Sequence, residues 1–374
     1  AIREKALGAD HPDTSISLNN LALLYREQGL YSKAEPLYER ALAIREKALG
    51  ADHPDTAISL NNLAGLYDDQ GLYSKAEPLL RRGLTVQNSL IQREAPFLPR
   101  RVRTAFVGSL GSAYEGSFSL ASRGKGGADL ALFARLNRQG LLEEIEKRQA
   151  QLASLSGPQQ ALAREVKDLT KRLSSLALKP EQRQALKVRQ EELEKQLYRL
   201  LPDLKPRLVE VDQVAAVLPA DGVLIEFQRY QPFDGKKPKG ERWGNARYLA
   251  MVLRPNGSIA VVDLGTAAVI DQAIAKGVDG IEQQISDAPE LMAKVSRLVI
   301  EPLQGATAGA NTWFVSADGE LNRLPFAALP LVGSESYLSE AVNLRLLTTG
   351  RELLDLQKPK AGASSDVLVV ADPA

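Results

Sequence analysis

The feature that most constrains this chain is a 42-residue segment that occurs twice in succession. Residues 1–42 and 43–84 align without a gap and differ at only seven positions, which in the first copy are 15, 23, 26, 27, 38, 39 and 41. Such near-identity at a fixed spacing is typical of a stacked array, because each copy must dock on a neighbour that resembles itself. Arrays of this kind need about three copies for stability, so we expect further copies before Ala1.

Each copy predicts a pair of helices. The first helix of the first copy carries a stripe at the spacing of a buried helical face, formed by Leu18, Leu21, Ala22 and Tyr25. The second helix carries a matching stripe of Ala34, Leu37, Tyr38 and Ala41. Gly29 suits the end of the first helix, and Pro12 with Asp13 suits its start. The chain is therefore predicted to begin as an α-solenoid.

Both copies resemble tetratricopeptide repeats, of the 42-residue kind found in kinesin light chains and many bacterial proteins. The matching residues of the first copy are Leu21, Ala22, Tyr25, Gly29, Ala34, Tyr38 and Ala41. Those of the second copy are Leu63, Ala64, Tyr67, Gly71, Ala76, Leu80 and Gly83, where the aromatic residue and the alanine of the pattern are lost. The resemblance implies a concave groove that binds a protein or peptide partner.

On the tetratricopeptide pattern, seven residues are expected to line this groove: Asn19, Leu23, Arg26, Glu27, Asn61, Asp68 and Asp69. Three of the seven differences between the copies fall among these positions. An asparagine amide offers a donor and an acceptor together, which suits the backbone of an extended peptide. The neighbouring charges would then select among the side chains of the partner. The alternative, that these are exposed positions which vary without consequence, stays open.

The composition excludes several kinds of chemistry. The chain contains no cysteine and two histidines, His11 and His53, which occupy the same position in each copy. Disulfides, thiolate zinc sites and thiol nucleophiles are therefore excluded, and we expect neither a cofactor nor a metal site. The net charge of +1 gives no basic footprint for nucleic acid. No apolar run reaches the roughly 20 residues that span a bilayer, so we expect no membrane partner and a cytoplasmic, bacterial location.

Residues 93–205 predict a helical or coiled-coil spacer. Thr104–Arg138 is rich in alanine, leucine and aromatic residues. Three amphipathic segments follow, and they are bounded by Gly157–Pro158, Lys179–Pro180 and Pro202. Their opposite faces carry Glu, Lys, Arg and Gln, so we expect a helical hairpin that projects into solvent.

Residues 206–374 predict an α/β domain. Strands are expected at 221–230, 246–253, 258–264, 311–315, 343–349 and 366–374, and helices at Val269–Lys276 and Leu291–Leu303. A polar loop, QPFDGKKPKGERWGN (231–245), separates the first two strands. Alternation of strands with helices favours an open sheet with helices on its faces. Turn or capping roles at strand ends are expected for the isolated carboxylates Glu226, Asp263, Asp318 and Asp372.

The block WFVSADGELNRLPFAALP, followed by YLSEAVNLRLL, TTGRELL and VLVVADP, resembles the CHAT domain. CHAT is a caspase-like module that commonly follows tetratricopeptide repeats in bacterial proteins. The resemblance implies a cysteine endopeptidase, in which a histidine activates a cysteine thiolate. Neither catalytic residue is present here, so none is assigned. We expect a fragment that ends before them; the alternative is a non-enzymatic tetratricopeptide scaffold with a CHAT-like pseudo-enzyme domain.

The expected fold class is therefore multidomain, α plus α/β. Tetratricopeptide repeats are expected at 1–92, the spacer at 93–205 and the N-terminal part of a CHAT domain at 206–374.

Overall fold

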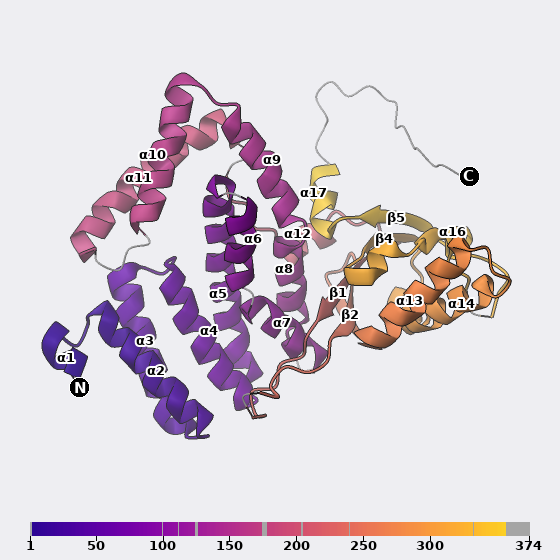
Figure 1. Cartoon of the computed structure of the whole chain (residues 1–374), viewed down its shortest axis with the longest axis horizontal. Helices are drawn as coiled ribbons and strands as arrows, with labels where there is room; N and C mark the ends of the chain where they lie inside the picture. Colours follow the sequence, from indigo (N-terminus) through magenta and orange to yellow (C-terminus); the bar gives the residue numbers. More distant parts are fainter. Residues whose placement is uncertain are drawn as a thin grey trace.

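The chain begins with two helical pairs, as Figure 1 shows for this computed structural model. The structure describes residues 2–98, 100–110, 112–123, 126–173, 178–202, 205–238, 240–331 and 333–356. A short helix α1 (Ile2–Leu7) precedes the repeat helices, which are α2 (Pro12–Glu27), α3 (Tyr31–Leu49), α4 (Pro54–Asp69) and α5 (Tyr73–Glu94). Both predicted pairs of helices are confirmed.

The repeat helices begin and end where the sequence predicts. The Nδ1 atoms of His11 and His53 each accept a hydrogen bond, 3.1 Å long, from the backbone N–H two residues later. Each histidine therefore caps the start of a helix. Gly29 and Gly71 follow the first helix of each pair with φ of 72° and 74°, a conformation that glycine adopts at little cost.

The middle of the chain is helical, as predicted, with α6 (Arg100–Ser109), α7 (Ser112–Ser122), α8 (Ala128–Arg138), α9 (Leu141–Ala153), α10 (Gly157–Leu173), α11 (Pro180–Leu200) and α12 (Val211–Ala215). The prediction that the hairpin projects into solvent is wrong, because α9, α10 and α11 arch back over the repeats (Figure 1). Arg93 of α5 forms an ion pair with Glu194 of α11 at 3.1 Å. Phe97 joins the apolar cluster that contains Leu193 and Leu197, so the end of the array covers part of the hairpin's apolar stripe.

The C-terminal part contains a mixed sheet of five described strands, β1 (Gly222–Tyr230), β2 (Arg247–Leu253), β3 (Ile259–Thr266), β4 (Thr312–Ser316) and β5 (Asn343–Leu347). Their order is β3-β2-β1-β4-β5, with β1, β2 and β3 antiparallel and β1, β4 and β5 parallel. The helices are α13 (Ala267–Glu282), α14 (Ala288–Val299), α15 (Gln304–Thr307), α16 (Leu338–Ala341) and α17 (Leu353–Leu356). Five expected strands are confirmed, and the sixth (366–374) lies outside the described residues.

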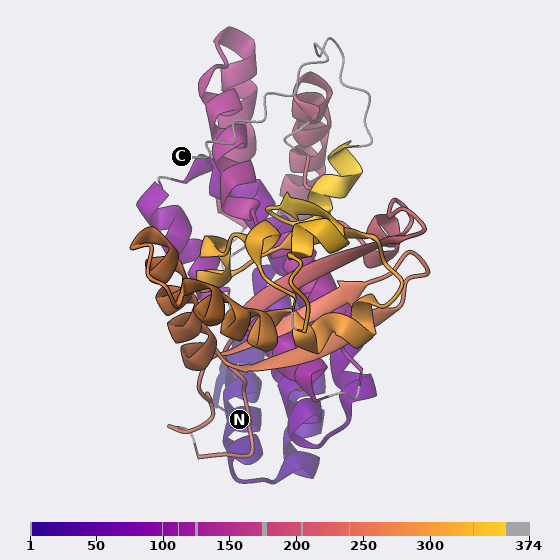
Figure 2. The ribbon, with the colours of Figure 1, turned by 90° about the vertical axis from the view of Figure 1, so that its right-hand side faces the viewer.

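Helices cover both faces of this sheet, which is why β1 is buried on both sides. Figure 2 looks at the sheet from the side of α13 and α14, with the repeat helices behind it. On the near face, Ile225 and Phe227 share an apolar cluster with Val295 of α14. On the far face, Leu224 shares another cluster with Phe133 of α8 and with residues of both repeats. The repeats, the spacer helices α7, α8 and α12, and one face of the sheet therefore form a single core.

Candidate functional site

The asparagines predicted to line the groove are turned toward the neighbouring helices rather than toward an open surface. Asn19 is only 5% exposed, and its amide nitrogen donates to the hydroxyl of Ser59 in the next copy at 2.9 Å. Asn61 is half-buried, and its Oδ1 lies 2.2 Å from the position that a Cβ on Gly83 would occupy. Leu23 is 40% exposed on α2 and remains open to a partner.

The charged groove residues form ion pairs at the C-terminal ends of α2 and α4. The guanidinium of Arg26 in the first copy contacts the carboxylate of Asp69 in the second, with Nε and Oδ2 2.5 Å apart. This guanidinium lies over Gly65, where an added Cβ would come within 2.8 Å of Nη1. The second copy thus has glycine where the first has Leu23, and aspartate where the first has Glu27. These two differences between near-identical copies have a structural reason.

Asp68 extends the chain of contacts beyond the repeats. Its carboxylate pairs with Arg123, which follows α7, and Arg123 also donates to the backbone carbonyl of Phe233. Burial raises the pKa of Asp68 above its usual value, while the charge of Arg123 opposes the shift. The ends of the repeat helices are thereby tied to a segment more than a hundred residues away in sequence.

That segment is the β1–β2 loop (231–246), which reaches from the sheet to the lower ends of α4 and α5 (Figure 1). Gly235 faces the second repeat so closely that an added Cβ would lie 1.8 Å from Oδ1 of Asp69. Arg242 approaches Glu27 at 3.7 Å, and the rings of Phe233 and Trp243 pack 4.9 Å apart. A hollow of about 420 Å³ remains between the loop, α7 and the end of the repeats. The predicted groove is therefore partly occupied by the chain's own loop.

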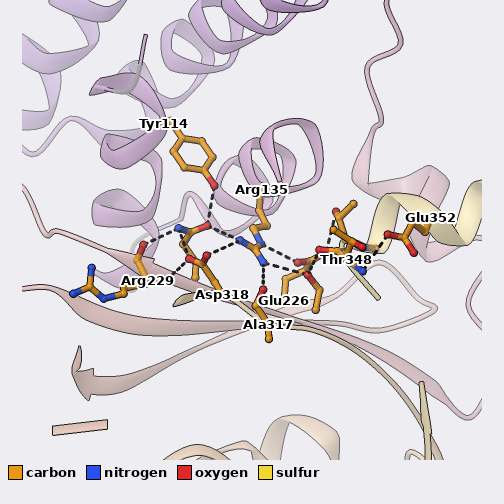
Figure 3. A network of polar contacts seen from close by, with 12 residues as sticks. Tyr114, Arg135, Glu226, Arg229, Ala317, Asp318, Thr348 and Glu352 are labelled. Carbon is orange, nitrogen blue, oxygen red and sulfur yellow. Dashed lines mark hydrogen bonds and ion pairs between the residues drawn. The ribbon is translucent and has the colours of Figure 1, made fainter. Parts of the chain in front are cut away.

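A second polar site is buried between α8 and the sheet, and Figure 3 shows its network of contacts. Arg135 and Glu226 are both inaccessible to solvent, and Nε lies 2.9 Å from Oε2. Arg135 also donates to the carbonyl of Ala317 at 2.8 Å and lies 3.8 Å from Asp318. Burial alone would lower the pKa of Arg135, but the charges of Glu226, Tyr114 and Asp318 and the hydrogen bond to Glu226 together raise it.

The expected position of Glu226 at a strand end is wrong, although its carboxylate does bind the backbone of a distant turn. Glu226 lies inside β1 rather than at its end, because the guanidinium of Arg135 compensates a charge that the sheet would otherwise exclude. Sequence reasoning missed Arg135, although each of the two is a charged residue within an apolar run. Asp318 does lie in a turn, where its carboxylate accepts from the backbone N–H of Arg229 at 2.8 Å. Asp263 pairs with Arg247 at 2.8 Å, and Asp372 lies outside the described residues.

Glu226 also fixes the turn that follows β5. Its Oε1 accepts from the backbone N–H of Gly350 at 2.5 Å, and Ser316 donates to the carbonyl of Thr348 at 2.9 Å. An added Cβ on Gly350 would lie 2.2 Å from a methyl group of Leu224, so the turn touches the sheet directly. The network therefore holds the carboxyl ends of β4 and β5, the edge at which open α/β sheets usually bind ligands.

A cleft of about 710 Å³ lies beside this edge, between α9, the segment formed by Pro202 and residues 205–208, and the turn after β5. Its guanidinium groups are engaged within the chain. Arg148 and Arg351 contact Glu144 at 2.7 Å and 3.3 Å, and Arg207 contacts Asp355 at 2.7 Å. Across the described residues, no cluster of three or more His, Cys, Asp or Glu side chains could hold a metal ion. Nor is any described helix long and apolar enough to span a membrane.

Comparison with protein families identifies both ends of the chain. A model of the tetratricopeptide repeat matches residues 1–47 and 20–89, and a model of the CHAT domain matches residues 289–374. No curated protein matches the sequence. The CHAT match begins in α14 and includes β4, β5 and their connecting turns. The chain thus combines N-terminal tetratricopeptide repeats with a CHAT domain near its C-terminal end.

Proposed function

We propose that the repeats bind a protein or peptide partner and that this binding acts on the CHAT domain. The tetratricopeptide match supports the first part, because such repeats generally mediate protein interactions. The observation that carries the second part is the chain of contacts that runs from Asp68 in the repeats through Arg123 to the backbone of Phe233 in the β1–β2 loop. A partner seated at the ends of α2 and α4 would meet a loop that continues directly into β1 and β2.

The CHAT module of the complete protein is proposed to be a cysteine endopeptidase of the bacterial cytoplasm. Support comes from the membership of CHAT domains in the caspase-like group. This activity needs a cysteine thiolate and a histidine base. The chain has no cysteine, and its two histidines cap repeat helices. The chain by itself is therefore proposed to bind a partner without cleaving it.

Site-specific photo-crosslinking tests the binding role. A photoreactive amino acid at Leu23, which is 40% exposed on α2, should capture a partner from extracts of the cells that produce the protein. An excess of unmodified chain should compete for that partner. The same label at Leu142, also 40% exposed but on α9, is the matched control. Equal products at both positions, or none that the unmodified chain competes for, would refute partner binding by the repeats.

A further inference from the structure

The end of the groove that contacts the β1–β2 loop is acidic, and the loop is basic. Glu27, Asp68 and Asp69 define this acidic end, where the described residues place Arg26 and Arg123 beside two of the three carboxylates. In the part of this loop that the structure describes, the basic side chains are Lys236, Lys237 and Arg242, and the acidic ones are Asp234 and Glu241. The charges of the two surfaces are therefore complementary.

The fit between the loop and the groove depends on a glycine. The carboxylate of Asp69 occupies the space that a side chain at position 235 would need, since Oδ1 lies 1.8 Å from an ideal Cβ there. At Gly240 in the same loop, an ideal Cβ would meet nothing within 4 Å. Of these two glycines, only the one that faces Asp69 has no room for a side chain, which indicates a specific contact there.

The loop nevertheless leaves the acidic end incompletely satisfied. Oδ1 of Asp69 is buried and accepts no hydrogen bond from the described residues. Arg242 lies 3.7 Å from Glu27, which is beyond hydrogen-bond distance. The hollow of about 420 Å³ beside these groups leaves room for a larger ligand. A segment that supplied the missing donor would bind better than the loop does.

We propose that the β1–β2 loop is an internal ligand of the acidic end of the groove, and that the partner of the repeats is a basic segment of the same chemistry. Such a segment would place a glycine against Asp69, with an aromatic residue before it and lysine or arginine after it. This inference rests on the proposed partner-binding function and names the partner class. The partner must displace the loop from the groove. Its binding would therefore break the contacts through which the loop connects the repeats to β1 and β2.

The peptide QPFDGKKPKGERWGN, labelled with a fluorophore, tests the inference by anisotropy. It should bind a full chain in which residues 232–245 are replaced by a short Gly-Ser turn. Binding to the intact chain should be about tenfold weaker or more, because the tethered loop competes at a high effective concentration. The same peptide with Gly235→Leu should bind the loop-shortened chain about tenfold more weakly, since a side chain there meets Asp69.

The intact chain provides a matched pair of variants that keeps the test independent of loop replacement. Gly235→Leu should push the loop away from Asp69, whereas Gly240→Leu points into open space. Trypsin should cleave after Lys236 about tenfold faster in G235L than in G240L, because cleavage follows the population of the open form. Circular dichroism should be the same for both variants.

The outcomes separate this inference from the proposed function. It is overturned if the peptide fails to bind a folded loop-shortened chain, if G235L and G240L are cleaved at equal rates, or if the peptide variant binds as tightly as the original. Peptide binding without any crosslinked partner at Leu23 would support the internal ligand and contradict the partner function. A crosslinked partner that the peptide does not compete for would overturn the inference and leave the function standing.

Discussion

At the scale of single residues, the two repeats show how position in the fold changes the chemistry of identical side chains. His11 and His53 cap equivalent helices with the same hydrogen bond, yet their side chains are 40% and 7% exposed. Burial lowers the pKa of His53 to about 4, although the nearby charge of Asp55 opposes the shift. The stacking of α10 and α11 against the array, rather than the repeat sequence, makes this difference.

His53 should make the stability of the chain depend on pH. Above its ordinary pKa of 6.5 the imidazole is neutral in both the folded and the unfolded chain, so its protonation takes nothing from the free energy of unfolding. As the pH falls from 6.5 toward 4, the unfolded chain binds the proton first, so at most about 3 kcal/mol of stability is lost. His53→Asn keeps a capping acceptor and should flatten this dependence in urea unfolding between pH 7 and 4.5.

The equivalent substitution His11→Asn is the control, because solvent already reaches that side chain. It makes the same change of side chain at the exposed cap, so it measures what the substitution does apart from burial. If H53N and the parent lost stability in parallel as the pH fell, the burial of His53 would not be its cause.

Arg135 and Glu226 should be far more costly to separate than to remove together. Arg135→Ala leaves the carboxylate of Glu226 buried without its cation, and a loss of about 3–5 kcal/mol in the free energy of unfolding is expected. The double variant R135M/E226L should recover most of that loss, since apolar side chains suit the site. Arg345→Ala, on the exposed side of β5, should cost less than about 1 kcal/mol. A double variant as unstable as R135A would refute the argument.

At the scale of elements, the turn after β5 shows how one side chain positions a whole segment. The carboxylate of Glu226 accepts a hydrogen bond from the N–H of Gly350, and the hydroxyl of Ser316 donates one to the carbonyl of Thr348. The turn that follows β5 is therefore held in place by a side chain of β1 and by a side chain at the end of β4. This turn also borders the cleft of about 710 Å³, so its position sets one wall of that cleft.

Gly350→Ala should destabilise this turn. The added methyl group would meet Leu224 at 2.2 Å, which requires the turn to move away from the sheet. Overpacking of this kind costs about 1–3 kcal/mol, measurable by urea unfolding. Gly305→Ala places its methyl group in open space and is the matched control. Equal stability of the two variants would show that the turn moves freely.

At the scale of the whole molecule, the repeats and the sheet share one apolar core. Phe133 of α8 is fully buried in it, with the guanidinium of Arg81 from α5 lying 4.4 Å from its ring centre. Leu224 of β1 belongs to the same cluster. The domain boundary expected between residues 205 and 206 therefore does not divide this core, because residues on both sides of it belong to the same apolar cluster. The three predicted domains remain a proposal.

A shared core predicts coupled unfolding. Phe133→Ala should lower the thermal midpoint of both the helical signal in circular dichroism and the fluorescence of Trp313, which lies in β4. The loss should be about 3–5 kcal/mol. Val166→Ala, in the separate cluster of the α10–α11 hairpin, should leave the Trp313 transition nearly unchanged. Two independent transitions in F133A would contradict a single core.

The chain itself should not cleave peptides. It has no cysteine, so thiolate chemistry has no nucleophile, and the Nδ1 atoms of both histidines are engaged as helix caps. A broad peptide library incubated with the purified chain should show no cleavage above background. Turnover that follows the protein through purification would require a nucleophile of another kind.

The sequence by itself determined the repeats, the helix caps and the described strands. These features depend on residues close together in the chain, such as those of the 42-residue period and of the short apolar runs bounded by turn residues. The CHAT motif was also recognisable, because its block is nearly continuous. Each of these features can be recognised from one continuous stretch of the sequence.

Only the tertiary structure decided which surfaces remain open. Arg135 and Glu226 are 91 residues apart, and neither is informative until α8 covers the sheet. Asp69 looks like an exposed groove residue in sequence, but the fold places Gly235 against it. The α10–α11 hairpin looks wholly solvent-exposed by its charges, but the end of the array covers part of its apolar stripe. Contacts between distant segments depend on how the elements pack, and local periodicity carries no record of that packing.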